Sequence, residues 1–363
     1  MKLNDIAEFV TDKICSSSIS LDRYVTTDSL LQNRRGRETA QNLPPIPCAL
    51  THYRQGDVLV ANIRPYLKKV WYADSEGGCS SDVLAFRAKN GHCSSFLYTV
   101  LMQDAFFDYA MSGANGSKMP RGDKDQIMRY ELPTFTPMEE ENIGNMMVDI
   151  MSKININRQI NDNLEEQLRL ITSRYIFGSP YLKKKRIGEI ATIKAGGDCP
   201  ITFSKTRTQE CNIPIFSNGT EDRGLYGFTN KANIEGHSIT VAARGTIGYC
   251  ERRLMPFVPI IRLLAITPKE DGAYIYLHQV IRGMKFKKNG SVQQQLTVPE
   301  ISFIEIPYPH SSVLHEYNNV ANPIVEMIER NINENEILTK QRDELLPLLM
   351  NGQATINYHL SDD

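Results

Sequence analysis

Two long stretches of the chain place mainly apolar residues at heptad spacing. In the first, positions alternately four and three residues apart fall on one face of a helix. They are Ile143, Met147, Ile150, Ile154, Asn157, Asn161, Leu164, Leu168, Ile171 and Tyr175. The pattern returns 174 residues later with one charged exception, Arg342. Its positions are Tyr317, Ala321, Ile324, Ile328, Asn331, Asn335, Leu338, Arg342, Leu345 and Leu349. Seams of this length predict two long helices that pair along these faces.

Both seams contain asparagine at the same two positions, Asn157 and Asn161 in the first and Asn331 and Asn335 in the second. A buried asparagine costs stability but can fix the register, because an asparagine that faces leucine leaves its amide unpaired. We therefore predict that these four residues set the register of the helix pair. The alternative explanation of the seams is that each amphipathic helix packs on its own domain.

The helices belong to a larger internal duplication. Residues 115–133 (NGSKMPRGDKDQIMRYELP) align without gaps on residues 289–307 (NGSVQQQLTVPEISFIEIP). Upstream, LNDIAEFV (3–10) resembles RIGEIATI (186–193), and DVLVANIRP (57–65) resembles SITVAARGT (238–246). The alternation of apolar residues in SITVAA predicts a half-buried strand. The chain is therefore expected to contain two copies of a mixed α/β unit, each followed by a helix.

We expect two pseudo-symmetric α/β domains that are joined and spaced by a two-helix antiparallel coiled coil. The segments are a first domain over residues 1–137, a helix over 138–178, a second domain over 179–310, and a helix with a C-terminal segment over 311–363. About 34 residues at about 1.5 Å each form a rod of roughly 50 Å, which would hold the domains at a fixed separation. A pseudo-twofold molecule suits a pseudo-symmetric ligand such as duplex DNA.

The composition favours a globular chain without a membrane segment. Of 363 residues, 41% are hydrophobic and 23% are charged, and no run of eighteen apolar residues occurs. The N-terminal stretch MKLNDIAEFVTDK lacks the apolar core of a signal peptide. The seven cysteines form no CxxC pair, which is typical of reduced thiols and favours the cytoplasm. We expect no metal site, since neither Cys48 with His52 nor Cys79 with His92 and Cys93 is joined by a second regular pair of ligands.

The net charge of −1 conceals an asymmetry along the chain. Residues 138–178 hold 4 Lys and Arg against 7 Asp and Glu, and residues 311–363 hold 3 against 9. The two helical segments together carry a charge of −9, and the remaining residues carry +8. Basic domains on an acidic spacer are expected when the domains face phosphate.

Basic and amide side chains gather at turns in both copies. In SITVAARGTIGYCERR (238–253), a glycine turn follows the predicted strand, and the stretch ends at Arg252 and Arg253, which suggests a ligand bound through phosphates. Arginine, lysine, glutamine and asparagine contact phosphates or base edges, and glycine lets backbone amides approach phosphate. Any single candidate could be an ordinary exposed turn residue, so the prediction depends on their shared placement. The DNA-binding candidates are Asn62, Arg64, Lys68, Lys69, Lys118, Arg121, Lys124, Asn218, Arg244, Gly245, Thr246, Lys287, Lys288, Ser291, Gln293, Gln294 and Gln295.

Common motifs of catalysis are missing from the sequence. It has no GxxxxGK[ST], no GxGxxG before a helix, no GxSxG and no HExxH, and its seven histidines are dispersed. It also lacks the Asn/Asp-Pro-Pro-aromatic stretch with which amino-methyltransferases hold a flipped adenine. We therefore expect a DNA-binding chain with no catalytic residues. Two alternatives are an enzyme with a hidden nucleotide site around Gly245–Gly248 and a stand-alone DNA-binding scaffold or regulator.

In their order along the chain, the matching stretches resemble the DNA-specificity subunit of type I restriction–modification systems over essentially the whole length. The first half contributes LNDIAEFV, GDVLVANIRPYLKKV, SSDVLAFRA and ELPTFTPMEEE. The second contributes KRIGEIATIKAGG, IPIFSNG, GLYGFTN, SITVAARGTIG, QQQLTVPEISFIEIPYP and LLMNGQ. The resemblance implies two target-recognition domains, each reading half of a split DNA site, and a coiled coil that sets the gap between the halves.

The resemblance also implies partners. In this family the specificity chain is not itself catalytic and binds no cofactor. Modification subunits, two being expected, bind S-adenosylmethionine and methylate adenine N6. Restriction subunits add ATP- and Mg²⁺-dependent translocation and cleavage. In the first domain MPRGDKD (119–125) stands where the second has QQQ, so the two domains are expected to recognise unrelated half-sites.

Overall fold

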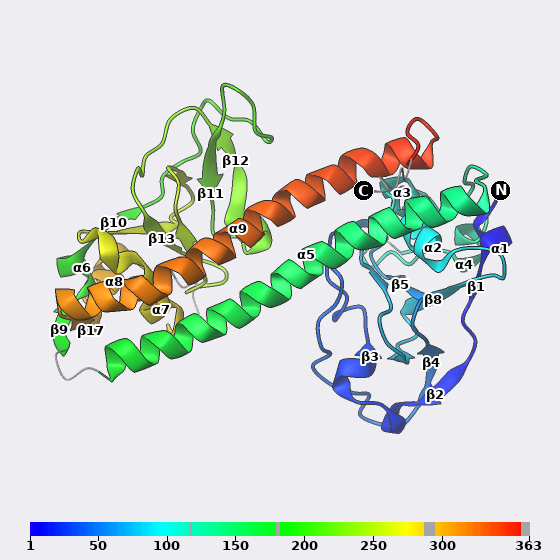
Figure 1. Cartoon of the computed structure of the whole chain (residues 1–363), viewed down its shortest axis with the longest axis horizontal. Coiled ribbons are helices and arrows are strands. Elements are labelled where there is room, and N and C mark those ends of the chain that lie inside the picture. The colour runs from blue at the N-terminus through cyan, green and yellow to red at the C-terminus, as the bar shows by residue number, and fades with distance from the viewer. Residues whose placement is uncertain (117, 179–181, 287–294, 357–363) are drawn as a thin grey trace, which may run out of the picture. The chain divides into compact units, whose positions relative to one another are not determined.

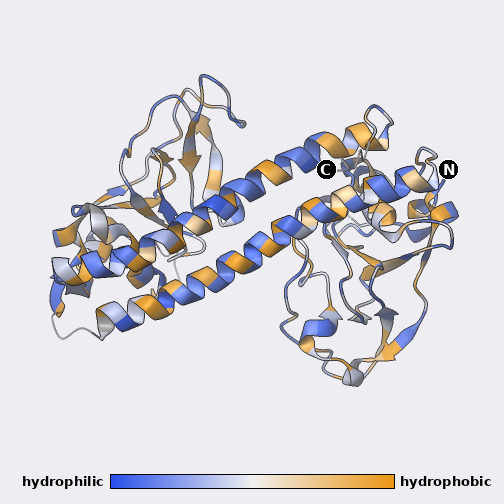
Figure 2. Ribbon diagram, in the orientation of Figure 1, coloured by the Kyte–Doolittle hydropathy of each residue, from blue (hydrophilic) through white to orange (hydrophobic). Residues whose placement is uncertain are grey.

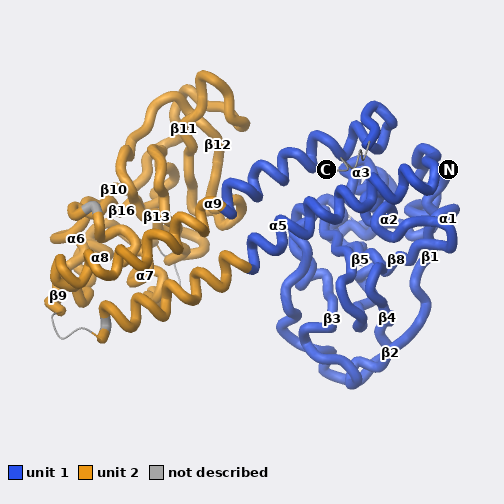
Figure 3. Tube along the Cα trace, viewed as in Figure 1, with its two compact units in different colours: residues 1–159, 331–363 blue, residues 160–330 orange. Residues whose placement is uncertain are grey.

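The computed structural model describes residues 1–116, 118–178, 182–286 and 295–356. It contains two compact units (Figure 3). Unit 1 comprises residues 1–159 with 331–363, and unit 2 comprises residues 160–330. Both units combine helices with mainly antiparallel sheets, which confirms the predicted mixed α/β class. Both long helices are cut by the unit boundaries, and the four-segment division at 137, 178 and 310 stays a prediction.

A four-stranded antiparallel sheet in the order β1-β8-β5-β6 lies in unit 1 (Figure 1). Its strands are β1 (Ala7–Phe9), β5 (Val58–Ala61), β6 (Val70–Tyr72) and β8 (Val83–Ala88). All four residues of β5 are buried, since this strand has a neighbour on each side and α2 (Ser94–Leu101) packs on it. Phe86 from the sheet and Phe96 from α2 belong to one apolar core.

Unit 2 contains a sheet of the same topology, in the order β10-β16-β13-β14. Its strands are β10 (Ala191–Ala195), β13 (Ser238–Val241), β14 (Cys250–Arg253) and β16 (Leu264–Pro268). The registers also correspond, because Val58 pairs with Phe86 in unit 1 and Ile239 pairs with Ile266 in unit 2. The two units therefore confirm the internal duplication at the level of topology.

A short helix precedes each of these sheets, α1 (Leu3–Ile6) in unit 1 and α6 (Ile187–Ile190) in unit 2. A carboxylate in the first turn caps the N-terminus of each helix. Asp5 accepts a hydrogen bond from the backbone of Lys2, and Glu189 accepts one from the backbone of Arg186. The same local capping is thus present in both copies.

The smaller sheets differ between the units. Unit 1 has the order β2-β4-β7-β3, in which β3 and β7 are parallel. Unit 2 has the order β12-β11-β15, in which β11 and β15 are parallel, and a separate antiparallel pair of β9 and β17. The strands are β2 (Lys13–Cys15), β3 (Tyr24–Val25), β4 (Ala49–Tyr53), β7 (Gly77–Cys79), β9 (Leu182–Arg186), β11 (Ile213–Phe216), β12 (Leu225–Thr229), β15 (Val258–Pro259) and β17 (Glu305–Pro309).

Short helices and turns complete the two units. The α-helices are α3 (Asp104–Ser112), α4 (Lys124–Ile127), α7 (Tyr274–Arg282) and α8 (Val298–Ser302). The 3-10 turns are η1 (Ser16–Ser18), η2 (Leu21–Arg23), η3 (Pro65–Leu67), η5 (Glu221–Gly224) and η6 (Asp271–Ala273).

Two long helices, α5 (Pro137–Thr172) and α9 (Ser311–Met350), correspond to the predicted seams. At the start of α5, Glu139 accepts hydrogen bonds from the backbone and hydroxyl of Thr136, a capping box with proline at the first helical position. A π-helical turn, η4 (Ser173–Phe177), follows α5. Figure 2 shows polar and apolar residues alternating along both helices, as the heptad pattern predicts.

The heptad seams are confirmed by burial, because every one of the twenty predicted positions is buried or half-buried. In unit 1, Ile143 and Met147 of α5 share a core with Leu349 of α9 and with Phe96 of α2. The seam residues therefore pack against their own domain as well as against the other helix. The sequence offered two explanations of the seams, pairing of the two helices and packing of each helix on its own domain. Both kinds of contact occur in this core.

The asparagines lie at the helix contact within each unit. In unit 1, Asn157 donates a 3.0 Å hydrogen bond to Asn335, which itself donates one of 3.3 Å to the backbone of Ile154. In unit 2, Asn161 donates one of 3.2 Å to the backbone of Ile328, while Thr172 and Tyr317 share one of 2.8 Å between their hydroxyls. Within each unit, rising numbers on α5 meet falling numbers on α9, so the helices are antiparallel. That the asparagines determine the register stays a prediction.

Candidate nucleic-acid interface

The turn between β13 and β14 presents three predicted DNA-contact residues, Arg244, Gly245 and Thr246, all of which are exposed. Gly248 donates a 3.0 Å hydrogen bond to the carbonyl of Ala242, which closes the turn. Gly245 and Gly248 have φ angles of +67° and +90°, which residues with a Cβ rarely adopt. At Gly248 a Cβ would also lie 2.5 Å from the ring of Phe286. The glycines therefore shape the tip that carries Arg244.

Two more candidates from distant segments meet this turn. Asn218 accepts a 2.8 Å hydrogen bond from the backbone of Ala243 and donates one of 2.6 Å to the carbonyl of Ile261. Gln295 accepts hydrogen bonds of 2.7 and 3.2 Å from the guanidinium of Arg244. The structure thus brings together Asn218, Arg244 and Gln295, which the sequence proposed separately.

The other candidates of the second copy, Lys287, Lys288, Ser291, Gln293 and Gln294, lie outside the described residues. Arg262 is a cation that the sequence analysis missed. It is exposed, has a φ angle of +63°, and follows Ile261, the residue that Asn218 contacts. Its apolar neighbours in the stretch IIRLL give it no turn signature, so only the structure makes it a candidate.

In unit 1 the residues that follow β5 lie beside residues 120–122. Ile63 and Arg121 form an antiparallel bridge, and the backbone of Arg64 donates a 2.8 Å hydrogen bond to Pro120. Arg64 and Lys68 have φ angles of +53° and +51°, a conformation that costs energy for residues other than glycine. Two candidate segments from the sequence therefore form one surface region of unit 1.

Several cations of this region are already engaged within the chain. Lys68 lies 2.6 Å from Asp104, and Arg121 lies 3.0 Å from Asp82. Lys69 donates a hydrogen bond to the carbonyl of Thr27, and burial lowers the pKa of its amine. If Lys68, Lys69 and Arg121 bind phosphate, each must break its contact within the chain or contact both partners at once.

The remaining candidates of unit 1 differ in accessibility. Lys118 and Lys124 are exposed, and the side chain of Arg121 is 60% exposed. By contrast, Asn62 is buried, and neither its side-chain oxygen nor Nε of Arg64 has a hydrogen-bond partner among the described residues. The exposed group is better placed for a first contact with DNA than Asn62.

Arg252 and Arg253 do not belong to this surface. The sequence suggested a phosphate ligand at the end of the stretch 238–253, but these arginines are 4% and 5% exposed. The reason is that carboxylates, hydroxyls and carbonyls from other parts of unit 2 accept their hydrogen bonds. Their contacts are internal.

In the part of the chain that the structure describes, no group of three or more His, Cys, Asp or Glu residues is arranged to hold a metal ion. Nor does any helix there have the length and apolar character needed to cross a membrane.

Sequence comparisons identify relatives of the chain. Residues 182–346 match the family model described as the type I restriction modification DNA specificity domain. A Mycoplasma pneumoniae protein named as a type I specificity subunit is 32% identical over 175 residues, covering 47% of this chain and 52% of the relative, about half its length. A second M. pneumoniae protein, named as the C-terminus of a type I specificity subunit, is 32% identical over 129 residues, covering 34% of this chain and 88% of the relative.

Structural comparison finds the same fold in a solved protein. The crystal structure of a type I restriction–modification system S subunit from M. genitalium matches with a TM-score of 0.63. The match covers 96% of this chain and 95% of that chain at 15% sequence identity. At this identity the likeness concerns the fold.

Proposed function

Because this chain belongs to the family of type I restriction–modification DNA-specificity subunits, we propose that it recognises a DNA site made of two separated half-sites. The duplicated sheet is the observation that carries the proposal. β5 and β13 hold equivalent places, and each runs into a turn that contains an arginine, Arg64 or Arg244. One copy for each half-site accounts for the duplication.

The mechanism is recognition and positioning. Lysine and arginine contacts to phosphates supply affinity that depends on salt, and contacts to base edges supply about 1–3 kcal/mol of discrimination each. The cluster of Asn218, Arg244 and Gln295 supports such a role, because it places amide and guanidinium groups at one exposed turn. The different loops of unit 1 support recognition of an unrelated second half-site.

The helix pair would set the gap between the half-sites and bind partner subunits. We expect two modification subunits, which carry S-adenosylmethionine and methylate adenine, and restriction subunits that use ATP and Mg²⁺. A target adenine must leave the base stack for this chemistry, which the partner would perform. The chain itself would contribute no catalytic group and would act in the cytoplasm.

The proposal is tested by mapping N6-methyladenine across the genome of the source cells with and without this gene. We expect the deletion to remove methylation at one split motif, two short blocks around an unspecified gap, and complementation to restore it. Pull-down of the tagged full-length chain should recover a methyltransferase.

An unchanged methylation map together with no recovered methyltransferase would contradict the proposal. Tight site-specific DNA binding by the isolated chain would then favour a stand-alone scaffold or regulator. Binding of S-adenosylmethionine or ATP by the purified chain would instead favour an enzyme with its own nucleotide site.

A further inference from the structure

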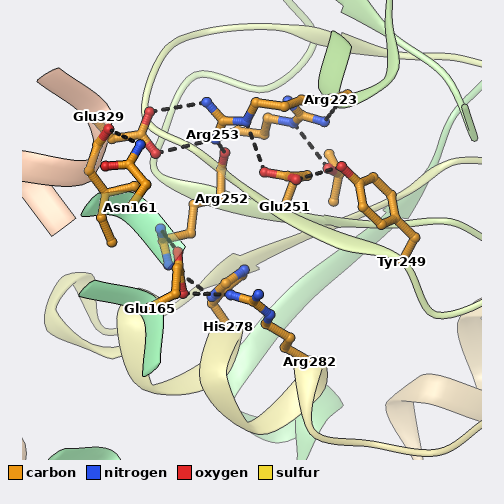
Figure 4. Close-up of polar contacts among 12 residues, drawn as sticks. Asn161, Glu165, Arg223, Tyr249, Glu251, Arg252, Arg253, His278, Arg282 and Glu329 are labelled. Atoms are coloured by element: carbon orange, nitrogen blue, oxygen red, sulfur yellow. Dashed lines mark hydrogen bonds and ion pairs between the residues drawn. The ribbon is translucent and has the colours of Figure 1, made fainter. Parts of the chain in front are cut away.

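Carboxylates on both long helices hold arginines of unit 2 (Figure 4). Glu165 of α5 accepts hydrogen bonds from Arg252 and, at 2.5 Å, from Arg282. Glu329 of α9 accepts two hydrogen bonds of 3.2 Å from Arg223. The side chains of Glu165 and Glu329 are each 17% exposed and that of Arg252 is 3% exposed, so water screens the contact of Arg252 with Glu165 poorly.

A second set of contacts ties these arginines to one another and to the sheet. Arg223 also donates to Glu251 at 2.9 Å and to the carbonyl of Arg252 at 3.2 Å. Tyr249 donates a 2.6 Å hydrogen bond to the other oxygen of Glu251. Arg223 has a φ angle of +55°, a strained conformation that these contacts hold in place. We call Glu165, Arg223, Glu251, Arg252, Arg282 and Glu329 the clamp.

Within the clamp, the charged forms of Arg223 and Glu251 are favoured. Burial opposes the charge of Arg223, but the carboxylates of Glu251 and Glu329 outweigh burial and raise its pKa above the usual value. Burial likewise disfavours the charge of Glu251, and Arg223 outweighs it and lowers the pKa of that carboxyl. Removing one partner would leave a buried charge unpaired, which is far more disruptive than loss of an exposed ion pair.

The clamp is continuous with the candidate DNA contact. β14, which carries Glu251 and Arg252, pairs with β13 along its whole length. The turn that joins these two strands carries Arg244 at its exposed tip. One hairpin therefore bears a helix contact on one strand and the candidate DNA contact at its turn.

The first copy folds the equivalent sheet without this clamp. Tyr72 of β6 stands where Arg252 stands in β14, because Tyr72 pairs with Val58 as Arg252 pairs with Ile239. The positions 174 residues from Glu165 and Glu329 hold Thr339 and Asn155, neither of which is charged. The sheet order thus forms without the clamp, which points to a role particular to the second domain.

We propose that Glu165 and Glu329 are positioning residues, which fix the orientation of the β13–β14 hairpin on the helix pair and thereby select the gap between the DNA half-sites. This inference rests on the proposed function. If the hairpin can tilt on α5 and α9, the base contacts of its turn remain, but their distance along the DNA from the other half-site varies. Loss of the clamp should therefore change which gap is accepted and leave the half-site sequences unchanged.

The test uses a strain in which this gene is deleted and replaced by wild-type, Glu165→Gln, Arg282→Gln or Glu166→Gln full-length chains. N6-methyladenine mapping then counts methylated half-site pairs at the wild-type gap and at gaps one base pair longer and shorter. Arg282 is the milder change because its side chain is 52% exposed. Glu166 is the matched control, since it lies beside Glu165 but is 56% exposed and pairs with the exposed Arg169.

We expect Glu165→Gln and Arg282→Gln to lower discrimination between gaps, by about tenfold for Glu165→Gln and less for Arg282→Gln, with the half-site bases retained and Glu166→Gln like wild type. Methylation confined to the wild-type gap in both variants would overturn the inference. So would loss of all methylation in Glu165→Gln together with wild-type behaviour of Arg282→Gln, because the clamp would then serve folding alone. A wild-type strain with no split motif would instead overturn the proposed function, and the inference with it.

Discussion

Two arginines eight positions apart on the same hairpin have opposite surroundings. Arg244 is exposed at the turn and contacts Gln295, whereas Arg252 is 4% exposed and contacts Glu165 and His278. Their neighbours in sequence do not show which of them is buried, because Arg244 follows two alanines yet is exposed, and Arg252 follows the charged Glu251 yet is buried. Glu165, whose carboxylate accepts a hydrogen bond from the buried Arg252, lies 87 positions away along the chain. At this scale, the role of an arginine depends on a distant partner.

Arg244→Ala should weaken binding to the mapped site by about 1–3 kcal/mol, because it removes a guanidinium from the exposed tip of the hairpin. Fluorescence anisotropy with labelled duplex DNA, with partner subunits present, measures the change. Folding should be retained, since the side chain is exposed and its hydrogen bonds go to Gln295. Arg169→Ala, at an exposed arginine of α5, is the control, and equal weakening by both variants would remove Arg244 from the interface.

His278 should make folding sensitive to mild acid. Burial and the nearby charges of Arg252 and Arg282 hold its pKa well below the usual 6.5, so the folded imidazole is neutral, and its Nδ1 accepts from Arg252 at 3.2 Å. Below pH 6.5 the unfolded chain takes up a proton that the folded chain does not. The contribution of this histidine is therefore fully present above that pH and falls below it, by at most about 1.4 kcal/mol per pH unit.

Urea unfolding of full-length wild-type and His278→Gln chains at about pH 7.5 and about pH 5.5 tests this linkage. Glutamine can still accept a hydrogen bond but does not titrate, so its free energy of unfolding should fall less on acidification than that of wild type. His315→Gln, at an exposed position of α9, should behave like wild type. Identical pH dependence in all three chains would show that His278 does not titrate on unfolding.

At the scale of elements, the long helices are the best-determined part of the sequence. A seam sustained over many turns is a periodic signal, and each position contributes to it independently of distant contacts. Their antiparallel pairing within each unit joins Asn157 to Asn335 and Asn161 to the backbone of Ile328. The amide groups thus have partners, although the positions lie on an otherwise apolar face.

Asn157→Leu should destabilise the helix pair by about 1–3 kcal/mol, because Asn335 and Glu334 would both lose a hydrogen bond from Asn157 beside a new apolar side chain. Asn157 is 1% exposed, so water cannot replace that partner freely. Asn157→Leu combined with Asn335→Leu should recover much of the lost free energy of unfolding, because two leucines pack against each other in a seam. A double-mutant cycle of unfolding free energies measures the coupling, and strictly additive changes would show that the pair does not act as a unit.

At the scale of the whole molecule, charge separates the helices from the rest of the chain. The segments 138–178 and 311–363 together carry −9, and the remaining residues carry +8. Phosphate contacts release counterions from DNA, so the strength of this attraction depends on salt. The net charge of −1 gives no indication of this separation of charge between the helical segments and the rest of the chain.

Affinity for the mapped DNA should fall by roughly tenfold or more between about 50 and about 200 mM monovalent salt, with a linear log–log slope. Titrations by fluorescence anisotropy at several salt concentrations measure the slope. Lys118→Ala with Lys124→Ala should reduce its magnitude by up to about 2 if both exposed lysines contact phosphates. A slope near zero for the wild-type complex would contradict an interface dominated by phosphate contacts.

The sequence by itself determined the duplication, the two heptad seams and the charge asymmetry. Each is a local or periodic property, recorded many times along the chain, so no single long-range contact is needed to detect it. The mixed α/β class and the positions of the long helices followed from these signals, and the family resemblance followed from the order of the matching stretches.

Only the tertiary structure decided which polar residues share a surface and which are buried. It joined Asn218, Arg244 and Gln295 at one turn, exposed Arg262, and buried Asn62 and Arg252. For Arg252, the physical reason is that burial of a charged side chain costs much free energy unless a partner of opposite charge offsets it. Such partners come from remote segments, as Glu165 does for Arg252. The pattern of residues along the chain does not show which remote segments come into contact.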